Sequence, residues 1–275
     1  ILLFFSLSLF AKESFIDVIT TNDLHGFLGE QDAYFMNPNF PPKIVGASAL
    51  YKYIKDVEKK LPNKSDDILI FDGGNFFQGH PTGIIDSGKT VIEWMNKVGY
   101  DAIVPGSNDF LFGHENLLEL ASIANFPFLS CNIRYEETNE LLFKPYEIIN
   151  IKGLKVGVLG LSNSNIKETV LEKNIEGIKI EPSIESMNFW ISKLVDNVDI
   201  IVLLTSSGVP WDREDVYKDF IDSIKNENLI DKHLNSIELG YYADNVDIII
   251  SGGISKGYRT PWYDKNSHTY TFQNY

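Results

Sequence analysis

The chain has 275 residues, 44% of them hydrophobic, which is enough for one large core or two small ones. Its aromatic content of 13% and charged content of 23% are ordinary for a globular protein and argue against a disordered, collagen-like or membrane-bundle sequence. The sequence has 24 Lys and Arg residues and 38 Asp and Glu residues, which gives a net charge of −14. No run of basic residues stands out in it. Such a surface repels phosphate backbones and anionic lipids, so we expect no nucleic-acid partner.

The first ten residues, ILLFFSLSLF, form an apolar and uncharged run. This run is too short to span a bilayer but has the length of the hydrophobic region of a signal peptide. We therefore expect residues 1–12 to be the end of a truncated signal peptide, and residues 13–275 to form one exported domain without an integral membrane segment. A buried N-terminal strand is the alternative. On the first interpretation the domain lies in the periplasm, at the cell surface or outside the cell.

Short apolar runs recur along the rest of the chain and predict β-strands that are buried on both faces. We place these strands at 15–20, 68–71, 102–104, 126–133, 156–161, 200–205, 246–251 and 270–273. The single cysteine, Cys131, lies within the fourth run. We expect it to pack in the core, and it has no second cysteine with which to form an internal disulfide.

Segments with helical periodicity separate the strands. Residues 50–57 place apolar side chains on one helical face, and residues 90–98 end at Gly99, which suits a helix C-terminus. Ser183 is expected to be the N-cap of the helix that follows it. The segment 30–42, rich in Asn and Pro, is predicted to be a surface loop. Alternating strands and helices over this length predict a layered α/β domain.

Small polar turns that contain glycine follow five of the predicted strands. They read TNDLHG (21–26), DGGN (72–75, continuing to Gln78-Gly79), PGSNDF (105–110), SSG (206–208) and GGISKG (252–257). One such turn is ordinary, because glycine often ends a strand. In layered α/β folds, however, ligands bind at the carboxyl ends of strands, so five turns of this kind predict loops that converge on a common site.

In order, spacing and strand context, these turns resemble the metal-site motifs of the calcineurin-like metallophosphoesterase superfamily, in the branch of 5′-nucleotidases and cyclic phosphodiesterases. That branch typically reads TNDxHG, DxGDxxQG, GNHDFDxG, LxHxG and SGHxHxG. The similarity extends to the sequence between the motifs, from about Phe15 onward. It implies a layered α/β fold in which helices flank a β-sheet sandwich. It also implies that the C-terminal domain of full-length 5′-nucleotidases is missing from this sequence.

The chemistry implied by the resemblance is hydrolysis of a phosphate ester, most naturally a nucleotide, by two divalent metal ions (Mn, Zn, Mg or Ca). The ions of such centres lie about 3.5–4 Å apart and clamp the phosphate. A bridging carboxylate offsets the repulsion between the cations. Imidazoles and one amide oxygen complete the coordination, and an uncoordinated His assists the leaving group.

Carried over position by position, the first motif keeps its two metal ligands as Asp23 and His25. The bridging carboxylate falls on Asn75, whose neutral amide is a poor bridge between two cations. Of the seven ligand positions, Asp23 and His25 are the two that match. We therefore expect no tightly bound metal; one weakly held ion at Asp23 and His25 is the alternative.

The other motif positions have changed to hydroxyl or amide side chains, or to glycine. The metal-binding Asn falls on Ser107, the catalytic His on Asn108, the His of the fourth motif on Ser206, and the two His of the last motif on Gly253 and Ser255. None of these supplies the charge or basicity that a pair of transition metals needs. Asn108, at the catalytic position, is expected to be incompetent.

Two alternatives for the site stay open. A shift of one residue in the third motif would place Asn108 on the metal-binding Asn and Asp109 on the catalytic His, although the flanking Gly and Phe residues argue against it. Asp72, His80 and Asp109 could also rebuild a single metal site. Such carboxylates more often accept hydrogen bonds in turns, and a loop histidine more often faces solvent.

Two functions therefore compete. The first is a non-catalytic relative that keeps the scaffold as a binding, regulatory or structural module outside the cell membrane. Its ligand would be a nucleotide or another phosphate ester, and the sequence does not indicate a protein partner. The second is an active phosphoric-ester hydrolase that uses one metal or a rebuilt site. A third interpretation, a gene in decay, fits less well because the turn glycines and apolar strands are intact, so the pattern favours the first.

Overall fold

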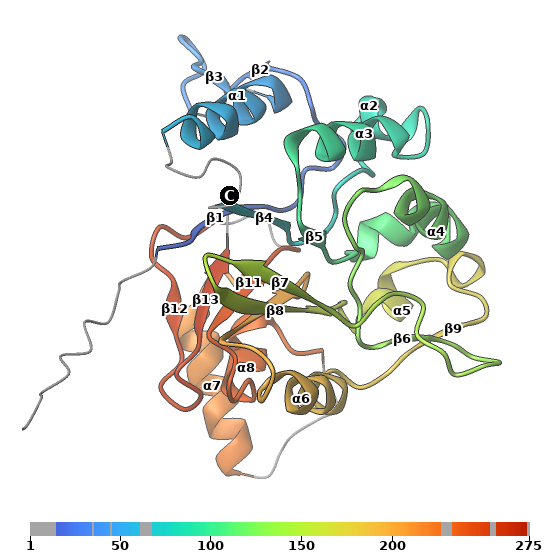
Figure 1. Ribbon diagram of the computed structural model, residues 1–275, viewed down its shortest axis with the longest axis vertical. Coiled ribbons are helices and arrows are strands. Elements are labelled where there is room, and N and C mark those ends of the chain that lie inside the picture. The colour runs from blue at the N-terminus through green and yellow to red at the C-terminus, as the bar shows by residue number, and fades with distance from the viewer. Residues whose placement is uncertain are drawn as a thin grey trace, which may run out of the picture.

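A computed structural model of the protein describes residues 15–34, 36–44, 46–60, 68–226, 233–253 and 257–273. Two β-sheets pack face to face in its centre, and helices cover their outer faces (Figure 1). The small sheet has the strand order β1-β4-β5, and the large sheet has the order β12-β13-β11-β10-β8-β7. The layered α/β sandwich expected from the sequence is confirmed.

Both sheets are built mainly from parallel strands. The strands of the small sheet are β1 (Asp17–Thr21), β4 (Ile68–Asp72) and β5 (Ala102–Ile103). The parallel strands of the large sheet are β8 (Leu154–Leu161), β10 (Ile200–Thr205), β11 (Ile248–Ser251) and β13 (Tyr270–Gln273). The antiparallel strands at its edges are β7 (Tyr146–Ile151) and β12 (Trp262–Tyr263). Because the parallel strands end on the same side, their loops are brought to one edge of the sandwich.

Helices of two groups complete the outer layers. Those packed on the small sheet are α1 (Ala47–Glu58), α3 (Lys89–Val98) and α4 (His114–Ile123), with the short α2 (Pro81–Ile84) beside α3. Those on the side of the large sheet are α6 (Ser183–Leu194), α7 (Arg213–Lys225) and α8 (Ser236–Tyr241). Within the described residues, no helix has the length and apolarity needed to cross a membrane.

Short elements lie outside these layers. They are the strand pairs β2 (Gln31–Asp32) with β3 (Lys43–Ile44) and β6 (Ile133–Tyr135) with β9 (Ile178–Ile180), the helix α5 (Ile166–Thr169), and the 3₁₀ helices η2 (Ser107–Phe112) and η3 (Glu172–Asn174). The predicted surface loop at 30–42 therefore contains a strand, and its short hairpin lies at the outer side of α1 (Figure 1).

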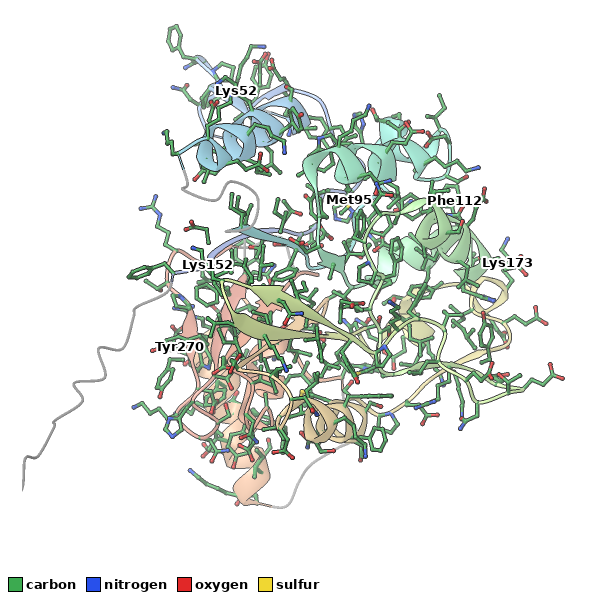
Figure 2. The ribbon with its side chains drawn as sticks, in the orientation of Figure 1. Lys52, Met95, Phe112, Lys152, Lys173 and Tyr270 are labelled. Atoms are coloured by element: carbon green, nitrogen blue, oxygen red, sulfur yellow. The ribbon has the colours of Figure 1, made fainter. Side chains whose placement is uncertain are left out.

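The alternation of side chains along each strand divides the core. In β4, Leu69 and Phe71 point between the two sheets, whereas Ile70 points toward the helices. Val202 and Leu204 of β10 meet Leu69 and Phe71 in the layer between the sheets. This explains why the strands read as continuous apolar runs, because each face has a partner layer. On the helix side, Figure 2 shows Met95 on α3, and its side chain is fully buried.

The prediction of a strand over 126–133 was wrong for most of that segment. Only single bridges form there, from Phe128 to Ile103 and from Leu129 to Lys144, and a regular strand begins at Ile133 as β6. The segment is apolar because it is buried between neighbouring layers rather than because it is paired along its length. Cys131 lies within it and is buried, as expected.

Two further differences concern β7 and α6. Strand β7 was not predicted, since most of its side chains are only half-buried and its text lacks a continuous apolar run. It pairs with β8 across a tight turn in which Lys152 and Gly153 both have positive φ. Ser183, expected as an N-cap, is instead the first residue of α6, and Pro182 occupies the cap position. Gly99 does end α3 in a left-handed conformation, as predicted.

Candidate functional site at the strand ends

Loops from both sheets meet at the carboxyl ends of their strands. One close approach joins the loop after β4 to the loop after β11, at Gly73 and Gly252. A Cβ atom added to Gly252 would lie 2.4 Å from the Gly73 carbonyl oxygen, and one added to Gly73 would lie 2.8 Å from the Gly252 nitrogen. The two glycines therefore allow backbone-to-backbone contact between the sheets at the predicted site.

The loops after β1 and β4 are joined by their backbones. Asp23, His25 and Asn75 have φ angles of 53°, 49° and 60°, in the left-handed region that non-glycine residues seldom adopt. The N–H of Asp23 donates to the Gly74 carbonyl at 2.9 Å, and the N–H of His25 donates to the Asn75 carbonyl at 2.9 Å. Strained backbone of this kind clusters at functional sites and persists when surrounding contacts hold it.

The carboxylate of Asp23 lies at the centre of the site, with 10% of its side chain exposed. Its Oδ1 accepts a hydrogen bond from Asn75 Nδ2 at 2.7 Å. Its Oδ2 accepts from Asn22 Nδ2 at 2.6 Å and from the backbone N–H of Gly253 at 2.9 Å. Asp23 thus binds loops that follow β1, β4 and β11 through hydrogen bonds to its negative charge.

His25 keeps the orientation typical of a metal-binding histidine. Its Nδ1 lies 2.9 Å from the carbonyl oxygen of Gln78, and because a carbonyl only accepts, this nitrogen carries the proton. The side-chain amide nitrogen of Asn108 lies 3.4 Å from the same ring nitrogen. In the neutral imidazole the other ring nitrogen, Nε2, then presents a lone pair, and it lies 3.9 Å from Asp23 Oδ1. Metal-binding histidines are commonly fixed by a backbone carbonyl in this way.

Asn75 is buried, with 7% of its surface exposed, and both ends of its amide are used. The nitrogen donates to Asp23, and the oxygen accepts from the backbone N–H of Asn108 at 3.0 Å. The side chain also fits tightly against Gly106, where an added Cβ would lie 2.3 Å from Asn75 Oδ1. Asn75 therefore bridges the loops after β1, β4 and β5.

A second chain of contacts connects the remaining loops. Ser107 Oγ donates to Asn165 Oδ1 at 3.0 Å, and the N–H of Asn165 donates to Asn163 Oδ1 at 3.0 Å. The Asn163 amide lies 3.4 Å from the Ser206 carbonyl oxygen. Sequence reasoning missed Asn163 and Asn165. Their signal was the run Ser-Asn-Ser-Asn directly after the predicted strand that ends at Leu161.

Ser206 and the last motif lie at the far side of this chain. Ser206 is buried, with 3% exposed, and its hydroxyl has no hydrogen-bond partner within the described residues. Gly253 has a φ of 105°, and an added Cβ would lie 2.1 Å from the Ser206 carbonyl oxygen. The two predicted positions are therefore adjacent. Ser255 lies outside the described residues.

Asp72 and Asp109, the other two carboxylates at these strand ends, accept hydrogen bonds that stabilise the loops. Asp109 is fully buried and accepts from the backbone N–H groups of Asn75 and Gly106, both at 2.8 Å, and of Phe76 at 2.9 Å. Burial raises the pKa of its carboxyl to about 7, against the opposing effect of these donors. Asp72 is also fully buried, and burial raises the pKa of its carboxyl well above its usual range. Asp72 accepts from the Thr21 hydroxyl at 2.6 Å and, as is common in tight turns, from a backbone N–H two residues on.

His80 does not share these contacts. Its ring nitrogen Nδ1 accepts the backbone N–H of Thr82 at 3.2 Å and so caps α2. The imidazole packs edge-on against the ring of Phe27, with 5.0 Å between ring centroids. Asp109 thus connects its own turn to the loop after β4, Asp72 binds Thr21 and its own turn, and the His80 side chain caps α2, so the three side chains are engaged in separate contacts.

The residues present do not fit a dinuclear metal centre. Asn75, expected from the motifs at the bridging position, turns N–H donors toward Asp23, whereas a bridge must offer lone pairs to two cations. Ser107 directs its hydroxyl to Asn165 on a neighbouring loop. Across the described ranges, no group of three or more His, Cys, Asp or Glu side chains is arranged to hold a metal ion.

Comparison with known proteins identifies relatives of the domain. No family model matches the chain. It is 27% identical over 195 residues to a 5′-nucleotidase of Vibrio parahaemolyticus, an alignment that covers 70% of this chain and 33% of that protein. The chain spans about a third of the length of the curated relatives it matches.

Solved structures share the fold. The sulfate thiohydrolase SoxB of Thermus thermophilus superposes with a TM-score of 0.73 at 18% identity, covering 96% of this chain and 52% of that one. The calcineurin-like phosphoesterase YfkN of Bacillus subtilis gives a TM-score of 0.67 at 23% identity, covering 89% of this chain and 73% of that one. The resemblance seen in the motifs is confirmed: the described domain is related to the N-terminal metallophosphatase domain of the 5′-nucleotidase branch of the calcineurin-like metallophosphoesterases.

Proposed function

We propose that this domain is an exported, 5′-nucleotidase-like metallophosphatase that has lost dinuclear metal binding and catalysis and now serves as a binding or structural module. One observation carries the proposal. The bridging position holds Asn75, whose amide nitrogen donates to Asp23 Oδ1 at 2.7 Å, where a bridging carboxylate and its two metal ions would otherwise meet. Two-metal hydrolysis needs both ions to stabilise the attacking and leaving oxygens.

Electrostatics support the same conclusion. A phosphate ester bound at this edge would meet the carboxylate of Asp23 without the compensating charge of two cations, in a chain whose net charge is −14. The position of the catalytic His holds Asn108, whose amide cannot transfer a proton as an imidazole does. Binding of a nucleotide would therefore depend on parts of the ligand other than its phosphate.

An active hydrolase is the second candidate, and His25 is the observation that favours it. Its Nε2 lone pair lies 3.9 Å from Asp23 Oδ1, and its other ring nitrogen is fixed by Gln78. This pair could hold one weakly bound divalent ion. Two protein ligands are one fewer than catalytic zinc sites commonly have, so such an ion would exchange readily.

The two candidates are separated by metal content and turnover. Protein purified without chelator is expected to contain substoichiometric metal by mass spectrometry, and to hydrolyse neither 5′-AMP nor p-nitrophenyl phosphate above background in added Mn²⁺. Two bound metals per chain, or turnover that Asp23→Ala abolishes, would overturn the proposal. Turnover that saturates with Mn²⁺ and is lost in His25→Ala would establish the single-metal hydrolase instead.

Export and ligand class are tested separately. Fractionation of cells that express the natural gene is expected to place the protein outside the inner membrane. Thermal shifts with AMP and with adenosine distinguish binding of the phosphate from binding of the nucleoside. Recovery of the protein in the cytosolic fraction would contradict the export proposal without affecting the assignment of the site.

A further inference from the structure

The loops of the site are joined by hydrogen bonds at positions that the motif resemblance assigns to metal ligands. Asn75 connects Asp23 to Asn108, and Gly253 connects Asp23 to the loop after β11. Ser107 continues the connection to the loop after β8 through Asn165. These contacts join loops from the small sheet to loops from the large sheet, so the junction is complete with protein groups alone.

The side-chain amide of Asn75 allows these loops to meet without a metal ion, because it donates a hydrogen bond to Asp23. Asp23 Oδ1 and Asn75 Nδ2 are 2.7 Å apart, and both side chains are largely buried. A carboxylate at position 75 would place two negatively charged groups at that separation, with only a cation able to offset their repulsion. The amide replaces repulsion with a charge-assisted hydrogen bond.

The same amide disfavours a cation. Asp23 already accepts hydrogen bonds from Asn22, Asn75 and Gly253, so an ion would have to displace these donors to reach its oxygens. At position 75 the nearest atoms to such an ion would be positively polarised N–H groups. The Asn75 amide thus joins its loop to Asp23 and occupies an oxygen that a cation would need.

We propose that Asn75 is the residue that makes this site independent of divalent cations, by clamping the loops after β1, β4 and β5 through Asp23 and the Asn108 backbone. The proposal rests on the proposed loss of metal binding and names the residue responsible. It implies that Asn75→Asp converts the junction into one that needs a cation for stability, because it restores a second carboxylate next to Asp23 and His25.

Thermal unfolding of the wild type and of Asn75→Asp, each in EDTA and in Mn²⁺, tests the proposal. The wild type is expected to unfold at the same temperature in both buffers. Asn75→Asp should unfold about 5–10 °C lower in EDTA, from the lost hydrogen bond and the new repulsion, and should recover most of this in Mn²⁺. The double variant Asp23→Asn/Asn75→Asp restores one amide and one carboxylate, and should regain stability in EDTA.

Asn116→Asp is a matched control, since its amide donates to the Ser87 carbonyl at 3.1 Å away from the site. It should lose stability without any response to Mn²⁺. Equal stability of Asn75→Asp and wild type in EDTA would overturn the clamp, and destabilisation of Asn75→Asp without recovery in Mn²⁺ would overturn its role in cation independence. If Asn75→Asp does not fold in EDTA, refolding in Mn²⁺ and the double variant still decide between these outcomes. Stabilisation of the wild type by Mn²⁺ would overturn both the proposed loss of metal binding and the cation independence assigned to Asn75, while the comparison of the two proteins in EDTA still tests the clamp.

Discussion

Gly252→Ala tests whether the two sheets must touch at the site. The added methyl group would lie 2.4 Å from the Gly73 carbonyl oxygen and 2.9 Å from Asn22 Cβ, where ordinary contacts are near 3.4 Å or more. One of the two loops would have to move by about 1 Å, and insertions of this kind into packed structure cost about 1–3 kcal/mol, occasionally more. Gly252 has no positive φ, so the cost is steric rather than conformational.

For a domain of this size, a loss of 1–3 kcal/mol lowers the melting temperature by about 2–12 °C. Circular dichroism would measure the melting temperature, and hydrogen exchange would follow the Gly253 N–H that donates to Asp23. Gly29→Ala is the control, because the nearest atoms that the structure describes around an added Cβ there belong to the ring of Phe27, at 3.9 Å. Equal melting temperatures for Gly252→Ala and Gly29→Ala, with unchanged protection of Gly253, would refute the reasoning.

Three further predictions concern single polar side chains. Asp109→Asn should lower the free energy of unfolding in urea by about 2–4 kcal/mol, because the amide N–H groups of Asn would point at backbone N–H groups that now donate to the carboxylate. Unchanged stability would contradict this role. Burial raises the pKa of Asp101 to about 6, above its value of about 4 in the unfolded chain, so the stability that protonation contributes is present below pH 4 and is lost as the pH rises through 6. Asp101→Asn keeps an acceptor for the Ile70 N–H. The melting temperature of this variant, measured relative to that of the wild type, should therefore be higher at pH 7.5 than at pH 4.5. An equal difference at both pH values would contradict this prediction. Ser206→Ala should be neutral or stabilising by up to about 1 kcal/mol in the same denaturant assay, because its buried hydroxyl has no hydrogen-bond partner among the described residues, and a large loss would show that the hydroxyl has a partner in solution.

The sequence predicted the parts of the fold that depend on burial. Strand β10 was predicted with the bounds that the structure has, and β4 to within one residue, because each is an apolar run with packing on both faces. Strand β13 was also predicted with its observed bounds, although Tyr270 and Phe272 on one of its faces are exposed. Strand β7 escaped prediction because it lies at a sheet edge with most of its residues half-buried. The segment 126–133 was misassigned because a buried but irregular segment has the same composition as a buried strand.

The site was predictable in its location but not in its bonding. Parallel strands bring their carboxyl ends to one edge, which explains why Asp23, His25, Asn75 and Asn108 were expected together and are found together. The partners of each group depend on loop conformation, including left-handed residues that local sequence does not specify. This is why the links through Asn165 could not be derived from the motifs.

The hydrogen bond from Gly253 to Asp23 joins residues separated by 230 positions in the chain. Closing so long a stretch of chain costs conformational entropy, and domains rich in such contacts fold slowly. Until the loop after β11 arrives, the carboxylate of Asp23 lacks this donor. The hydrogen bonding of Asp23 is therefore complete only when the loop after β11 has reached the loop after β1, and a chain that is still folding there leaves this carboxylate without its Gly253 donor.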